Sequence, residues 1–211
     1  MRRDQLEHIL RAASTIAGDP EVLILGSQSI LGSFSEDELP EKAHASIEAD
    51  VTFFNDYDNE KSDMVDMHIG EDSQFHATFG YYAQGVNVEV AILPAGWRDR
   101  IVSYTGEGAN GAQALCLEPH DLVVAKLVAY RMKDMEFADA LLAAGLIDPD
   151  TLMERAQELE APLHKRIVTG WVVGWVMKHG IAARDDPPHT DAIADEVADA
   201  GDEHRRRRRL P

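Results

Sequence analysis

Cysteine is almost absent from this 211-residue sequence, in which Cys116 stands alone. A single cysteine excludes an intramolecular disulfide and a zinc site built from cysteines, and it indicates a reducing compartment. Long apolar runs are absent too, since the longest, around residues 167–177, falls far short of the ~20 residues that a membrane-spanning helix needs. No apolar signal-peptide segment follows Met1. We therefore expect a cytoplasmic protein without a membrane partner, in which Cys116 is a small buried hydrophobic residue.

Basic residues are scarce as well, with 20 Lys and Arg against 38 Asp and Glu and a formal net charge of −18. The electrostatic field of this negative charge repels phosphate backbones at long range, which argues against a general nucleic-acid-binding module. It does not forbid an RNA substrate, because a local basic patch acts within a Debye length of about 8 Å. The many carboxylates suit a protein that gathers Mg²⁺, although a solvated acidic surface is the commoner explanation.

Hydrophobic periodicity and turn residues predict a mixture of strands and helices. We expect strands at residues 22–25, 46–54, 79–93 and 114–117, and helices at residues 4–17, 61–67, 97–102, 119–131, 134–144, 150–159 and 162–179, with a further helix opening at 28–31. Residues 1–117 are expected to form the core domain and residues 118–182 a helical region packed on it. Residues 183–211 are acidic and then Arg-rich, and we expect disorder there. The Arg205–Arg209 run is either solvated or a segment that binds RNA or a partner.

The first candidate site is the Gly26-Ser27 step, which directly follows a predicted buried strand. Glycine lets the backbone turn sharply and approach a ligand closely. Ser27 adds a hydroxyl, and its N–H lies near the start of a predicted helix, where phosphates bind. Taken alone, the pair is more typical of an ordinary turn, since Gly-Ser steps are common.

Acidic residues form the second candidate site. Glu48 and Asp50 stand two apart on a predicted strand and therefore share a face. Burying two carboxylates side by side is costly unless a cation such as Mg²⁺ lies between them. The alternative is a solvent-facing strand edge, since Ser46 shares that face. Glu89 would add a third carboxylate if its predicted strand lies beside this one, and is otherwise a single exposed position.

Lysines on the predicted helix at 119–131 form the third candidate site. If that helix continued unbroken, Lys126 and Lys133 would share one face. They could then hold triphosphate oxygens and offset the charge that develops during transfer. The alternative is a pair of ordinary surface lysines.

Together these segments resemble the nucleotidyltransferase superfamily with its polymerase-beta-like fold. More narrowly, they resemble uncharacterised toxin-like nucleotidyltransferases related to abortive-infection toxins. The resemblance covers roughly residues 5–160, in segments 25–32, 46–50, 69–76, 79–82, 93–97 and 117–137. It implies an α/β (α+β) fold with a small mixed sheet and C-terminal helices. It also implies transfer from a nucleoside triphosphate, with Mg²⁺ or Mn²⁺, to a tRNA, another RNA or a protein acceptor, and an antitoxin as a partner.

The resemblance also implies roles for single residues. Asp50, Lys126 and Asp134 would be catalytic; Gly26, Ser27, Gln28 and Lys133 would bind the nucleotide; Glu48, Asp50 and Glu89 would hold the metal. Two departures from the family pattern stand out. Residues 33–45 form an insertion between Gly-Ser and the acidic pair, and that pair is Glu-x-Asp rather than Asp-x-Asp. They motivate an alternative, a catalytically inactive member of this fold that serves as a binding or regulatory protein.

Overall fold

The computed structural model describes residues 1–185, with side chains up to residue 180. The chain divides into two compact units, residues 1–175 and residues 176–211, because few backbone contacts join them. The sheet and the helices that cover it belong to the first unit. The predicted tail lies outside the described residues, including Arg205–Arg209, except that residues 183–185 end helix α8 (Pro162–Asp185). No helix in the described part of the chain is both long and apolar enough to cross a membrane.

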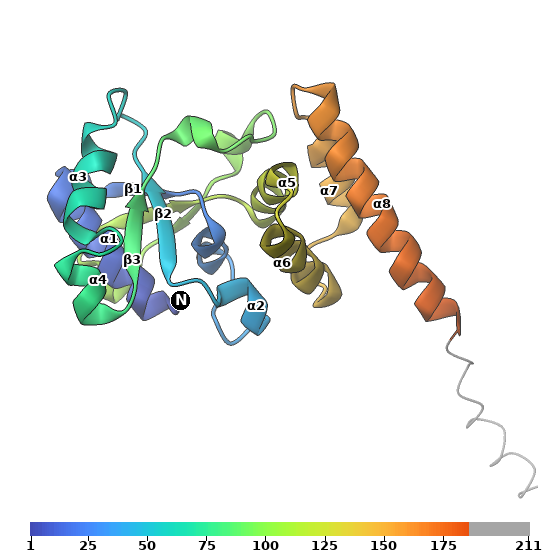
Figure 1. Cartoon of the computed structure of the whole chain (residues 1–211), viewed down its shortest axis with the longest axis horizontal. Coiled ribbons are helices and arrows are strands. Elements are labelled where there is room, and N and C mark those ends of the chain that lie inside the picture. The colour runs from blue at the N-terminus through green and yellow to red at the C-terminus, as the bar shows by residue number, and fades with distance from the viewer. Residues whose placement is uncertain (186–211) are drawn as a thin grey trace, which may run out of the picture. The chain divides into compact units, whose positions relative to one another are not determined.

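A mixed five-stranded sheet has the order β3-β2-β1-β5-β4 (Figure 1). Its strands are β1 (Glu21–Ile24), β2 (Glu48–Thr52), β3 (Tyr82–Gly85), β4 (Val102–Tyr104) and β5 (Gln113–Cys116). β1 is antiparallel to β2 and parallel to β5, β2 is parallel to β3, and β4 is antiparallel to β5. The predicted mixed α/β fold is therefore confirmed.

Burial along the strands explains their positions in the sheet. The central β1 is apolar on both faces, as expected for a strand covered on both sides, and Val22, Leu23 and Ile24 are fully buried. β2 alternates instead: Ala49 and Val51 are fully buried, whereas Glu48 and Asp50 remain partly exposed on the other face. This alternation directs the acidic pair toward one side of the sheet.

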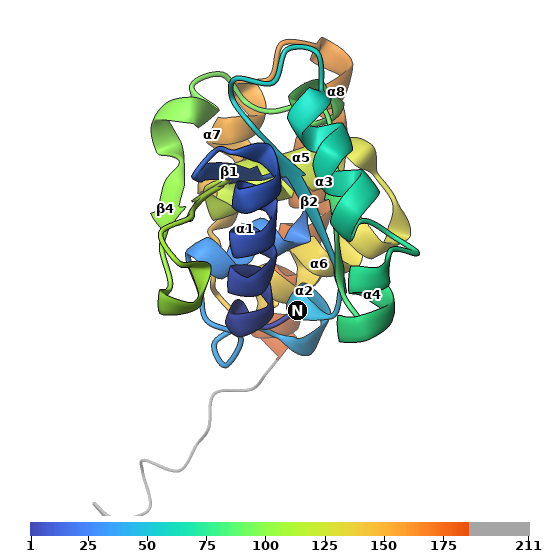
Figure 2. The same ribbon diagram turned by 90° about the vertical axis from the view of Figure 1, so that its left-hand side faces the viewer.

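Helices cover the sheet on both sides (Figures 1 and 2). α1 (Arg3–Ala17), α3 (Glu60–Ile69) and α4 (Gln74–Phe79) lie on one side, and α5 (Pro119–Ala129) and α6 (Met132–Ala143) lie on the other. α7 (Pro149–Gln157) packs on α5. The short α2 (Glu41–His44) packs on α6. Four 3₁₀ helices complete the fold: η1 (Ser27–Gly32), η2 (Val88–Val90), η3 (Trp97–Arg100) and η4 (Glu107–Ala109).

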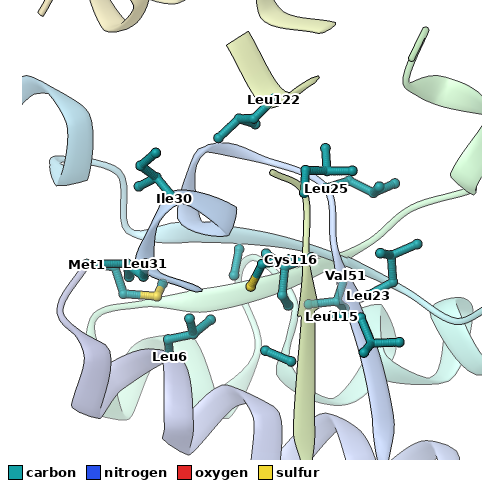
Figure 3. Packing of buried hydrophobic residues seen from close by; sticks show 14 of the residues in the cluster. Met1, Leu6, Leu23, Leu25, Ile30, Leu31, Val51, Leu115, Cys116 and Leu122 are labelled. Atoms are coloured by element: carbon teal, nitrogen blue, oxygen red, sulfur yellow. The ribbon is translucent and has the colours of Figure 1, made fainter. Parts of the chain in front are cut away.

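The core includes Cys116, as predicted for a small buried hydrophobic residue. Its side chain is fully buried, and burial raises the pKa of the thiol to about 12. Figure 3 shows the Cys116 side chain beside β5, on the side that faces Leu31, Met1 and Leu6. Side chains of the strands, of α1 and of η1 meet around Cys116, and the core continues into α3, α5, α6 and α7.

One predicted strand is largely wrong. Of residues 79–93, only Tyr82–Gly85 is a strand. Beyond it, the Asn87 side-chain oxygen accepts the Glu89 N–H at 2.7 Å and starts η2, because a capping side chain competes with strand pairing. The structure also adds α2, α4 and β4, which the sequence pattern did not predict.

Candidate active site

A pocket of about 760 Å³ lies between β2 and helices α5 and α6, with α2 along one end. Its volume falls in the range of about 300–1,000 Å³ that is usual for small-molecule sites. Its walls come from the end of β1, from α2 and β2, from the segment around η2, and from α5 and α6. The lining residues are Leu25, Gly26, Ser27, Lys42, Ala43, Ala45, Ser46, Glu48, Asp50, Val86, Val90, Ala91, Ala125, Lys126, Ala129, Arg131, Lys133, Asp134, Glu136 and Phe137.

Gly26 lies directly against the carboxylate of Asp50. A Cβ atom added to Gly26 would come within 1.7 Å of Asp50 Oδ2. The two residues meet because β1 and β2 are hydrogen-bonded neighbours, and Leu25 N–H extends the pairing to Asp50 O at 3.0 Å. Only glycine leaves room for the carboxylate at this point. The structure therefore brings together the Gly-Ser step and the acidic pair, as the resemblance implies.

Gln28 does not join this pocket. Its side chain is fully buried, and Nε2 donates to the backbone oxygen of Ser46 at 3.1 Å. Its predicted contact with the nucleotide stays a prediction, since Nε2 holds the segment before β2 and Oε1 is buried without a hydrogen-bond partner in the described part of the chain. Ser27 does line the pocket.

Glu48 and Asp50 both line the pocket from one face of β2. Burial raises the pKa of Glu48, and the neighbouring charge of Asp50 raises it further. Tyr82 lies beside Glu48 in the strand register, and burial raises the pKa of its phenol, with the charge of Glu48 adding to the shift. The acidic pair is thus crowded and costly to keep fully ionised without a cation.

Lys126 and Asp134 face the acidic pair from α5 and α6. The side chain of Asp134 is 1% exposed, and its Oδ1 lies 3.5 Å from Lys126 Nζ. Lys126 Nζ also lies 5.0 Å from the centroid of the Phe137 ring, within cation–π range. Burial lowers the pKa of Lys126, while the charges of Asp134 and Asp50 oppose that shift.

Lys133 reaches the pocket from α6, because the condition for a face shared with Lys126, one unbroken helix, is not met. The helix is not continuous: α5 ends at Ala129, and Tyr130 takes a left-handed conformation with φ 54° before α6 begins at Met132. Lys126 and Lys133 therefore do not share one helix face, yet both line the pocket. The turn brings the two helices together around it.

Glu89 is not brought to the acidic pair. It is exposed and belongs to η2 rather than to a strand beside β2. Its neighbours Val90 and Ala91 line the pocket, but Glu89 does not. The predicted convergence of three carboxylates is therefore wrong, because the Asn87 cap ends the strand pairing before Glu89.

Residues 4–169 match a protein family described as nucleotidyltransferase of unknown function (DUF6036). The chain belongs to this family. The family and the mixed sheet agree with the predicted nucleotidyltransferase fold. No curated protein and no solved structure gives a significant match to the chain.

Arg131 is a pocket residue of this family member that the sequence pattern did not indicate. Its Nε donates to Asp134 Oδ2 at 2.6 Å and Nη2 to Oδ1 at 3.3 Å. These contacts raise the pKa of the guanidinium, and the charges of Asp50 and Glu48 add to the shift. The i,i+3 spacing of Arg131 and Asp134 is the sequence signal for this pair, but Arg131 stands at the predicted end of one helix and Asp134 at the predicted start of the next. Asp134 thus holds two cations at the pocket wall.

Proposed function

We propose that this nucleotidyltransferase moves a nucleoside monophosphate from a nucleoside triphosphate to an RNA or protein acceptor, with Mg²⁺ or Mn²⁺. One observation carries the proposal. The acidic pair, packed against Gly26, faces two cations held by buried Asp134 across a single pocket. The carboxylates suit a metal ion, and the cations opposite them suit phosphate groups. Phosphoryl-transfer chemistry requires this combination.

Glu48 and Asp50 fit a divalent cation by the chemistry of their donors. Mg²⁺ in proteins commonly takes one or two carboxylates and completes its shell with waters and substrate phosphates. Within residues 1–185, no three or more His, Cys, Asp or Glu side chains gather as metal ligands. A two-carboxylate site that relies on the nucleotide is consistent with that donor set. When bound there, the cation would neutralise phosphate charge and polarise the α-phosphate.

The other pocket residues are placed to hold the triphosphate. Ser27 offers its hydroxyl beside Gly26, at the wall that the acidic pair shares. Lys126 and Arg131 offer positive charge to the phosphates and to the departing pyrophosphate. Asp134 is a positioning residue, because its contacts fix both cations and it is itself buried.

The test is a transfer assay with α-labelled nucleoside triphosphates, Mg²⁺ or Mn²⁺, and cellular RNA or protein as acceptor. We expect label in one acceptor class, and a loss of more than about a hundredfold in Asp50→Asn, because transition-state charge stabilisation is removed. Asp63→Asn, an exposed acid on α3 outside the pocket, is the matched control and should retain full activity. Absence of label, or activity that survives Asp50→Asn, would refute the enzymatic proposal and favour the inactive alternative.

A role as the toxin of a toxin–antitoxin pair, acting in the cytoplasm, extends the proposal. Its support is the resemblance of the motifs to abortive-infection toxins, together with a single buried cysteine that suits a reducing compartment. Expression should then arrest growth, and both Asp50→Asn and a co-expressed neighbouring antitoxin should relieve the arrest. Growth that is equally slow with Asp50→Asn would exclude this role.

A further inference from the structure

The pocket has one apolar end, formed by residues outside the acidic pair and the cations. Val86, Val90 and Ala91 form it from the segment after β3, and Ala125 and Ala129 of α5 also line the pocket. Val86 directly follows β3, and its N–H donates a hydrogen bond to Val51 O at 2.9 Å. This end therefore lies beside the C-terminal half of β2.

The opposite end of the pocket is polar. Ser46 precedes β2, and Lys42 of α2 and Glu136 of α6 approach each other at 4.0 Å. Because β2 and β3 are parallel, Ser46 and Val86 lie at opposite ends of the strand pair. At the Val86 end the lining is apolar, whereas at the other end Ala43 and Ala45 alternate with the polar Lys42 and Ser46.

The apolar end offers few groups that could read the edge of a base. Its side chains are Val and Ala, and the backbone N–H groups of Val86, Val90 and Ala91 are already bonded, to Val51 O, Asn87 O and Val88 O. The amides of Ala125 and Ala129 belong to the interior of α5. The polar groups left on this wall are carbonyl oxygens. Val90 is nevertheless 67% exposed, so it presents apolar surface that a flat ring would cover.

We propose that the nucleobase of the donor lies against Val90 at this apolar end, and that the site accepts all four bases. This inference rests on the proposed function, because the triphosphate must occupy the charged centre for the base to reach Val90. A site that hydrogen-bonds its substrate discriminates by about 10⁴–10⁵, whereas an apolar wall discriminates by about 10–200-fold. Because the base would contact Val90 without specific hydrogen bonds, the site should accept any of the four nucleoside triphosphates as donor.

Calorimetric titration of the full chain in Mg²⁺ with ATP, GTP, CTP, UTP and inorganic triphosphate tests the inference. We expect the four nucleotides to bind within about tenfold of one another, and inorganic triphosphate to bind at least about tenfold more weakly, because it lacks the base. A preference of more than about two hundredfold for one base would overturn base tolerance, even if transfer activity confirms the proposed function. Failure of all four nucleotides to bind would overturn both proposals.

Two variants of the same loop locate the base. Val90→Asp should weaken all four nucleotides by about tenfold or more and leave inorganic triphosphate within about twofold. Ile92→Asp is the matched control, because Ile92 is 42% exposed and does not line the pocket, and it should change neither. Unchanged nucleotide binding in Val90→Asp, or equal weakening in both variants, would overturn the placement of the base. Both side chains are exposed, so circular dichroism should show an unchanged fold.

Discussion

At the scale of single residues, the contact between Gly26 and Asp50 sets the geometry of the pocket. Gly26→Ala would place a methyl group 1.7 Å from Asp50 Oδ2, so the carboxylate must move. We expect a loss of about 1–3 kcal/mol in the free energy of unfolding and a loss of Mn²⁺-dependent nucleotide binding. Urea denaturation and calorimetric titration measure the two effects.

Gly106→Ala is a control with the same kind of clash at another place. Its methyl group would come within 1.9 Å of Glu7 Oε1, far from the residues that line the pocket. This variant should lose a similar amount of stability and keep nucleotide binding. If both variants lose binding equally, general destabilisation rather than displacement of Asp50 is the cause.

Glu48 is a residue at which the requirements of the site oppose stability. Burial and Asp50 raise the pKa of Glu48, so the folded chain binds its proton more tightly than the unfolded chain. Between the unfolded pKa and the raised folded pKa, the wild type therefore loses stability as the pH rises. Without divalent cations, Glu48→Gln should be more stable than the wild type by about 0.5–1 kcal/mol at pH 7. The gain should vanish near pH 4; a less stable Glu48→Gln at pH 7 would contradict the argument.

At the scale of elements, the junction of α5 and α6 depends on a buried charge cluster. Asp134→Asn would leave Lys126 without its buried carboxylate partner and should cost about 3 kcal/mol in the free energy of unfolding. The double variant Lys126→Met/Asp134→Asn removes both charges and should be more stable than Asp134→Asn alone. Chemical denaturation of the wild type, both single variants and the double variant gives the coupling energy. A coupling energy near zero would show that Lys126 and Asp134 do not stabilise the junction together.

The elements around the pocket show which features the sequence pattern predicts and which it does not. The acidic pair was predictable because the two-residue period of a strand places Glu48 and Asp50 on one face without reference to the rest of the chain. Gly26 beside Asp50 followed only by resemblance, since strand order is a long-range property. The break between the two helices was predicted at residues 131–134, but its position at Tyr130 was not, because the left-handed residue there is neither Gly nor Asn. Glu89 failed for a local reason, the competing side-chain cap of Asn87.

At the scale of the whole molecule, the pocket differs from the rest of the chain in its charge balance. Four basic residues, Lys42, Lys126, Arg131 and Lys133, and four acidic ones, Glu48, Asp50, Asp134 and Glu136, line it. The chain as a whole carries a formal net charge of −18. A polyanionic acceptor is therefore repelled at a distance and meets a balanced surface only at close range.

An RNA acceptor should consequently show an unusual salt dependence. The Debye length shortens to about 8 Å at physiological ionic strength, which screens the long-range repulsion more than the short contacts inside the pocket. The KM for RNA should fall by a few fold as salt rises from low to physiological concentration, and initial transfer rates at fixed Mg²⁺ measure it. A protein acceptor of balanced charge provides the control and should change little. If the KM for RNA instead rises steeply with salt, counterion release from a cationic surface dominates, and RNA must then bind a basic surface outside the charge-balanced pocket.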